Sequence, residues 1–114
     1  MSNVTELVEG LDAMLDHMRT DYAQWCDLGD DPNGTRTRMT EEYCASLQYS
    51  MGKKYVKVTD GSSVKAFVVA CEDDKKFQYG DILKPAGWRT PARNFRRGNV
   101  LDRTFDRVRW TGAL

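Results

Sequence analysis

The sequence predicts an α+β fold, with two N-terminal helices packed on or beside a small antiparallel sheet of three to five strands. Apolar residues recur every three or four positions in the first part of the chain, which is the period of an amphipathic helix. From Lys54 onward they alternate with polar residues, which is the period of a strand with one buried face. The length of 114 residues and the hydrophobic content of 40% are typical of one domain with one core, so we expect residues 1–114 to form a single domain.

Residues 1–28 are expected to form a long, acidic, amphipathic helix. Asn3 and Glu6 make a capping-box-like pair at its start. Gly10 lowers helix propensity by about 1 kcal/mol relative to alanine, which predicts a bend or fraying in the first turns. The apolar stripe consists of Val4, Leu7, Val8, Leu11, Met14, Leu15, Met18, Tyr22 and Trp25. A helix of this length either lies across the sheet or extends past its own domain and pairs with a second copy, which would make a homo-oligomer.

A second helix is expected over residues 38–51. The helix follows a loop rich in Asp, Pro, Asn and Gly, and it is expected to end at Gly52. Its expected buried side consists of Tyr43, Cys44, Leu47 and Met51.

Residues 54–111 are expected to form the antiparallel β region. The Asp60-Gly61 pair predicts a hairpin turn between the first two strands. Two prolines, two glycines and two large aromatic residues indicate an irregular but ordered basic loop over residues 85–99. The expected strands are Lys54–Thr59, Val64–Cys71, Phe77–Lys84 and Phe105–Thr111.

The charge is polarised along the chain although the net charge is zero. Residues 1–34 carry eight acids and one base, whereas residues 84–114 carry eight bases and two acids. Such asymmetry indicates either a nucleic-acid-binding face opposite an acidic face or two ends that attract each other, within one chain or between copies.

Several classes of function are disfavoured by the motifs. No secretory signal and no membrane-length apolar run is present, so we expect a cytoplasmic location and no membrane partner. The acidic run before Gly34 does not fit a calcium loop, because Gly29 and Thr40 would occupy positions that need carboxylates. Three cysteines and one histidine, none paired in sequence, do not fit a structural zinc site. We therefore expect no metal and no other cofactor.

Motifs of enzymes are not found either. His17 lies among acids on the first helix, where an exposed or partly exposed position is expected, and no nucleophile forms a motif with it. The chain has no phosphate-binding loop of a known kind. The paired carboxylates lie in polar turns, where water keeps their pKa values ordinary. We expect a protein that is not an enzyme.

The basic C-terminal third favours nucleic-acid binding. Single-strand binders combine bases that follow the phosphates with aromatic rings that stack on nucleobases. The expected site residues are Lys84, Arg89, Arg93, Arg96 and Arg97 for phosphates, and Trp88 and Phe95 for bases. The arginines at positions 93–97 are expected to be exposed. Trp110 and Phe105 are expected in the core, whereas Trp88 and Phe95 fit a buried or an exposed position equally well.

The stretch from Lys54 to Asp102 carries four short motifs in order, which are Ser63-Val64-Lys65-Ala66-Phe67-Val68, Gly80-Asp81-Ile82-Leu83-Lys84, Trp88-Arg89-Thr90-Pro91-Ala92 and Arg97-Gly98-Asn99. In these motifs the stretch resembles small proteins of unassigned function encoded by tailed bacteriophages. The resemblance implies a phage accessory protein that acts in the cytoplasm of the bacterial host. It also implies a protein that binds nucleic acid, or one that binds and redirects a host protein.

Two hypotheses therefore stay open. The first is a non-enzymatic nucleic-acid-binding protein that prefers single-stranded DNA and acts in phage genome metabolism or transcription. The second is a modulator or inhibitor of a host factor, with the acidic helix as the binding surface.

Overall fold

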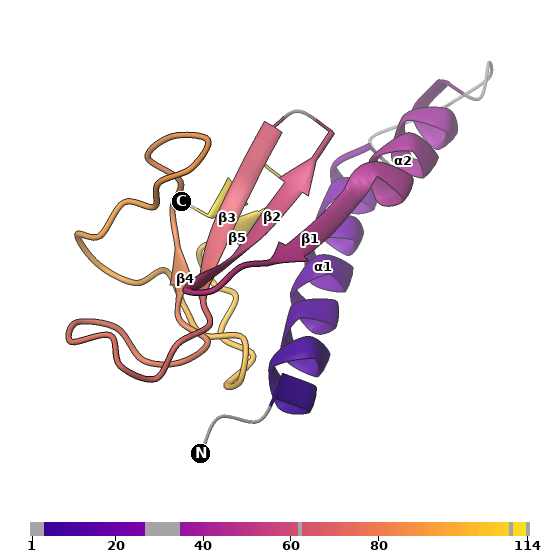
Figure 1. Ribbon diagram of the computed structural model, residues 1–114. Coiled ribbons are helices and arrows are strands. Elements are labelled where there is room, and N and C mark those ends of the chain that lie inside the picture. The colour runs from indigo at the N-terminus through magenta and orange to yellow at the C-terminus, as the bar shows by residue number, and fades with distance from the viewer. Residues whose placement is uncertain (1–3, 27–34, 62, 110, 114) are drawn as a thin grey trace.

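The computed structural model describes residues 4–26, 35–61, 63–109 and 111–113, and it shows a long helix lying along a small sheet (Figure 1). Four strands form an antiparallel sheet in the order β1-β2-β3-β4, and β5 pairs separately with β6. The predicted α+β fold is confirmed. The elements are α1 (Val4–Cys26), α2 (Thr35–Ser46), β1 (Leu47–Met51), β2 (Tyr55–Asp60), β3 (Ser63–Val69), β4 (Ile82–Leu83), β5 (Val108–Arg109) and β6 (Gly112–Ala113).

The apolar stripe of α1 packs against one face of the sheet, which we call the inner face. The stripe residues and their partners on the strands belong to one cluster of buried side chains. Burying a large aliphatic side chain stabilises the fold by about 1.5 to 3 kcal/mol, so this contact holds helix and sheet together. The helix therefore packs along the sheet of its own chain (Figure 1). Buried members of the cluster include Leu7, Leu11, Met14, Leu15, Met18 and Tyr22 on α1 and Val56, Val58, Ala66, Val68 and Ile82 on the sheet.

At Gly10, α1 closely approaches the backbone of Val100. A Cβ atom at this position would lie 2.6 Å from the carbonyl oxygen of Val100. The helix runs without interruption through Gly10, so the bend or fraying expected from low propensity is not seen. The glycine is needed here because the backbone of Val100 occupies the space of a side chain.

The second helix is shorter than predicted, and the prediction of helix through residues 47–51 is wrong. Residues Leu47–Met51 form β1 and pair with β2, with Leu47 opposite Asp60 and Met51 opposite Val56. Tyr43 and Leu47 are four positions apart and both buried, which gave the segment a helical period. Pairing with the β2 edge overrides that local pattern and leaves Met51 50% exposed.

Two predicted strands also differ from the structure. Of residues 77–84 only Ile82–Leu83 pair as a strand, because the Asp74 carboxylate accepts the backbone N–H groups of Lys76 and Phe77 and folds the preceding residues into turns. Among the described residues of the expected strand over 105–111, only Val108–Arg109 form a strand, β5, which pairs with β6. Trp110, expected in the core, lies outside the described residues. The strands expected at 54–59 and 64–71 match β2 and β3 within one or two residues.

The outer face of the sheet is buried over β3 and β4 and more exposed over β1 and β2. Ser50, Lys57, Phe67 and Leu83 lie in register across β1, β2, β3 and β4. Leu83 and Phe67 are buried in a second apolar cluster with Val69 and Phe77, whereas Lys57 is half-buried and Ser50 is exposed. The open half of the outer face therefore lies over β1 and β2.

Candidate nucleic-acid interface

The segment after β4 forms an ordered loop with Trp88 at its tip. Ala92 N–H donates to the Lys84 carbonyl at 2.7 Å, and Ala86 N–H donates to the Thr90 carbonyl at 2.8 Å. Pro85 and Pro91 pair as an isolated bridge at the base of the loop, and Pro91 is buried. Backbone hydrogen bonds thus hold the loop closed and leave its aromatic tip at the surface.

Trp88 lies over the open half of the outer face. The ammonium of Lys57 is 4.4 Å from the centre of the Trp88 ring and 6.0 Å from that of Phe67. A cation over an aromatic ring at this distance is attracted by the negative face of the ring. Trp88 remains 49% exposed, so about half of its surface is available to a ligand.

A pocket of about 270 Å³ lies beside this contact, at the turn between β1 and β2. It is both basic and aromatic, which is the combination that single-stranded nucleic acid requires. Its bases are Lys53, Lys54, Lys57 and Arg89, and its other lining residues include Tyr55, Phe67 and Met51.

Three of these bases were missed by the sequence analysis, namely Lys53, Lys54 and Lys57. The signal was present in the alternation of β2, since Tyr55 and Lys57 must share the face opposite Val56 and Val58. Of the predicted phosphate contacts, Arg89 lines this pocket. Lys84 is exposed at the base of the loop and is not among the described residues that line it.

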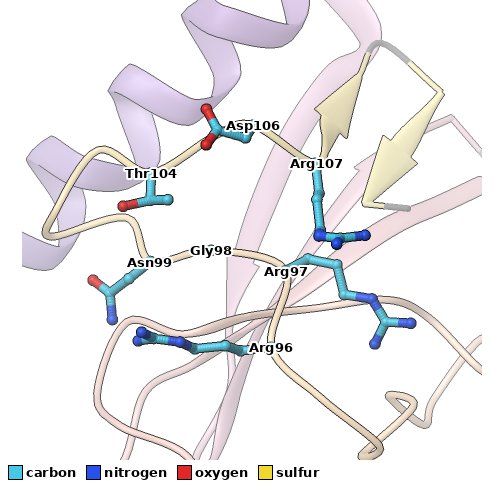
Figure 2. Close-up of a pocket in the computed structure, with 7 residues that line it drawn as sticks. All are labelled: Arg96, Arg97, Gly98, Asn99, Thr104, Asp106 and Arg107. Atoms are coloured by element: carbon cyan, nitrogen blue, oxygen red, sulfur yellow. The ribbon is translucent and has the colours of Figure 1, made fainter.

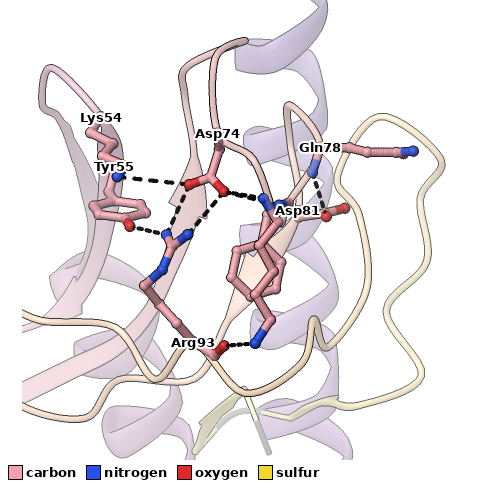
Figure 3. A network of polar contacts seen from close by, with 8 residues as sticks. Lys54, Tyr55, Asp74, Gln78, Asp81 and Arg93 are labelled. Atoms are coloured by element: carbon pink, nitrogen blue, oxygen red, sulfur yellow. Dashed lines mark hydrogen bonds and ion pairs between the residues drawn. The ribbon is translucent and has the colours of Figure 1, made fainter.

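Arg93 is engaged in a polar network that fastens the loop to the sheet (Figure 3). Its guanidinium donates to both carboxylate oxygens of Asp74, at 2.8 and 2.9 Å, and to the hydroxyl of Tyr55. The Asp74 side chain is only 1% exposed. Hydrogen bonds from Arg93 are the largest cause that lowers the pKa of Asp74, and the hydrogen bond from the backbone N–H of Lys76 is the next. The same carboxylate raises the pKa of Arg93. Arg93 therefore positions the loop rather than offering a free charge to phosphates.

Arg97 is buried, so the prediction that it is exposed is wrong. It is 6% exposed, and its guanidinium donates to Asn94 Oδ1 at 2.8 Å and to the Phe95 carbonyl at 2.7 Å. The guanidinium carbon also lies 3.9 Å from the centre of the Phe95 ring, which is itself 46% exposed. Local hydrogen bonds and the aromatic ring compensate for the loss of water around Arg97.

Arg96 takes the opposite direction from Arg97, as Figure 2 shows. Its side chain is 52% exposed and lies 3.1 Å from the buried carboxylate of Asp81. The acid partners of Arg93 and Arg96 thus come from residues 74–81 and not from the acidic helix.

The family model described as a family of unknown function, DUF7717, matches residues 2–114. The chain belongs to this family. None of the curated proteins and none of the solved structures matches it. The family model spans the acidic helix and the basic loop together, so both belong to one family unit.

His17, on α1, is half-buried and has a structural contact in this family member. Its Nε2 lies 2.8 Å from the carbonyl oxygen of Val108, and its ring centre is 5.2 Å from that of Phe105. The histidine thereby joins α1 to β5 and to Phe105 just before it.

Two further properties concern the described part of the chain. None of its helices is long and apolar enough to span a membrane. Among the same residues, no three His, Cys, Asp or Glu side chains gather closely enough to hold a metal ion.

Proposed function

We propose that this DUF7717 member binds single-stranded nucleic acid, with single-stranded DNA favoured, and that it does so without catalysing a reaction. The observation that carries the proposal is the contact between Lys57 and the exposed ring of Trp88, beside a pocket with three further bases. Trp88 would stack on a base while the neighbouring ammonium and guanidinium groups contact phosphates. The bacteriophage resemblance adds the proposed setting, which is phage genome metabolism or transcription in the cytoplasm of a bacterial host.

The preference for single strands follows from the role of Trp88. A ring can stack on a base only when the base is not already stacked within a duplex, and such stacking contributes about 1 to 3 kcal/mol per base. The net charge of zero also disfavours a strong duplex binder. Glu6, Glu9, Asp12 and Asp16 of α1 are exposed, and no acid of α1 is among the described residues that line the basic pocket.

The proposal is tested by fluorescence anisotropy with a labelled oligothymidylate at increasing salt. Each phosphate contact to a single strand contributes about −0.7 to the slope of log K against log salt. The four basic side chains of the pocket therefore predict a slope no steeper than about −3. The Lys57→Gln substitution is expected to weaken binding of the oligothymidylate and to make the salt dependence of the affinity shallower. Lys75→Gln is the matched control, because Lys75 is an exposed base outside the pocket lining. Absence of binding at low salt, or binding without a salt slope, would end this proposal.

A second candidate function is binding of a host protein through the acidic face of α1. Glu9, Asp12 and Asp16 are exposed along this face. Such a row of carboxylates can imitate the charge of nucleic acid. Capture of a bacterial protein that is lost with Glu9→Gln and Asp16→Asn, and that persists after nuclease treatment and in Lys57→Gln, would favour this function over the first.

A further inference from the structure

Two arginines share one aromatic ring at the end of the basic loop. The guanidinium carbon of Arg97 lies 3.9 Å from the centre of the Phe95 ring, and that of Arg107 lies 5.6 Å from the same centre. Since both groups sit on one ring, two positive charges are held close together. This use of Phe95 differs from the base-stacking role expected from the sequence.

Arg97 and Arg107 line a pocket of about 180 Å³ (Figure 2). Figure 2 shows the side chains of Arg97 and Arg107 extending to one side of the pocket and that of Arg96 to the other. The lining contains three arginines and one carboxylate, Asp106. This volume is below the range of about 300 to 1,000 Å³ that holds a drug-sized ligand, so the pocket suits a small ionic group.

The backbone beneath the pocket is fixed. A Cβ atom at Gly98 would lie 2.1 Å from the Thr104 carbonyl oxygen, so only glycine allows the two segments to approach this closely. Asn99 holds the same turn, donating to Asp81 Oδ1 at 2.9 Å and accepting the Leu101 N–H at 2.7 Å. The guanidinium of Arg97 is held by its hydrogen bonds to Asn94 Oδ1 and the Phe95 carbonyl, so it is placed before any ligand arrives, which lowers the entropic cost of binding.

The electrostatics of Arg97 favour an anion. Burial is the larger cause that lowers the pKa of Arg97, and the positive charge of Arg107 lowers it further. An oxyanion between the two guanidinium groups would relieve their repulsion. The planar fork of arginine matches the oxygens of a phosphate group and forms short, charge-assisted hydrogen bonds with them.

We propose that Arg97 and Arg107, held on the Phe95 ring, form a binding site for a phosphate group. The phosphate comes either from the backbone of the strand that Trp88 binds or from a phosphomonoester. The first source rests on the proposed function, and the second does not. Asp106 opposes the anion from the pocket lining and limits its affinity.

The site is tested on the full chain by following the Arg97 and Arg107 side-chain Nε–H resonances during titration. The probes are inorganic phosphate, thymidine monophosphate and an oligothymidylate. Arg107→Gln is expected to weaken phosphate binding about tenfold, the effect of losing a hydrogen bond between charged groups. Arg109→Gln, an exposed neighbour that removes the same charge outside the pocket, is expected to change it less than twofold. Asp106→Asn is expected to strengthen binding.

The outcomes separate this inference from the proposed function. Binding of inorganic phosphate or thymidine monophosphate that depends on Arg107 supports the site even if no oligonucleotide binds. Oligonucleotide binding that weakens with Arg107→Gln but not with Arg109→Gln supports the backbone source. The site would be overturned if Arg107→Gln and Arg109→Gln changed the affinity for every probe equally. It would also be overturned if no probe shifted the Arg97 and Arg107 resonances. Oligonucleotide binding that needs Trp88 and not Arg107, with no Arg107-dependent binding of inorganic phosphate or thymidine monophosphate, would also overturn the site and leave the proposed function standing.

Discussion

Arg93 and Asp74 form a bidentate ion pair, with hydrogen bonds of 2.8 and 2.9 Å, that ties the basic loop to the segment between β3 and β4. The two residues belong to different loops, and the carboxylate also accepts two backbone N–H groups at 2.9 and 3.0 Å. One carboxylate thus fixes both the turn before β4 and the loop after it. We expect the position of Trp88 to depend on this pair.

The ion pair is expected to contribute to global stability. Asp74→Asn leaves Arg93 without its anionic partner, and breaking a buried pair usually costs about 3 to 5 kcal/mol. Because the Arg93 side chain is 36% exposed, water compensates in part, so we expect a loss of about 2 kcal/mol. Urea unfolding at neutral pH measures this loss. Asp102→Asn, which neutralises an exposed carboxylate, is the control, and equal losses in the two variants would contradict the role of the pair.

The same pair predicts how stability depends on pH. The pKa of Asp74 is lowered in the folded chain, so the folded state binds this proton less readily than the unfolded state does. The resulting stabilisation is complete above the ordinary aspartate pKa of about 3.9 and is lost as the pH falls below it. Urea unfolding from pH 7 to pH 2.5 should show a smaller decrease for Asp74→Asn than for the wild type. Parallel decreases would show that Asp74 is not the group responsible.

Gly10 gives a prediction opposite to that of helix propensity. Alanine favours a helix over glycine by about 1 kcal/mol, so an exposed site would be stabilised by Gly10→Ala. Here the new Cβ would meet the Val100 carbonyl oxygen at 2.6 Å, and forcing an atom into a filled core costs about 1 to 3 kcal/mol. We expect a net loss of stability and a lower melting temperature by calorimetry. A stabilised Gly10→Ala protein would mean that α1 does not contact this segment.

The sequence predicted the parts of the fold that depend on local periodicity. The stripe of α1 and the strands around Val56 and Val68 follow from the spacing of apolar residues, and the burial of these residues confirms it. The conversion of Leu47–Met51 from helix to strand could not be predicted in the same way, because it depends on the free edge of β2. The turn at residues 74–81 depends on side-chain to backbone hydrogen bonds, which leave no hydrophobic period.

The candidate site was predicted less completely than the fold. The basic loop and Trp88 could be found from composition, since bases and aromatic residues alternate there. The tertiary partners of the arginines could not be found, because Asp74 was predicted to lie in a solvated polar turn and Asp81 in a strand. Lys57 reaches Trp88 only through the register of the sheet, which places it beside Phe67 on the outer face.

The contact of Trp88 with a nucleobase is the central claim, and the affinity of Trp88→Ala for a labelled oligothymidylate tests it most directly. Loss of one stacked base is expected to weaken binding about tenfold or more, and Trp88→Phe should retain most of the affinity because it keeps an aromatic face. Lys75→Gln serves as the reference, with affinity close to that of the wild type. Trp88→Ala binding within twofold of the wild type would contradict the account.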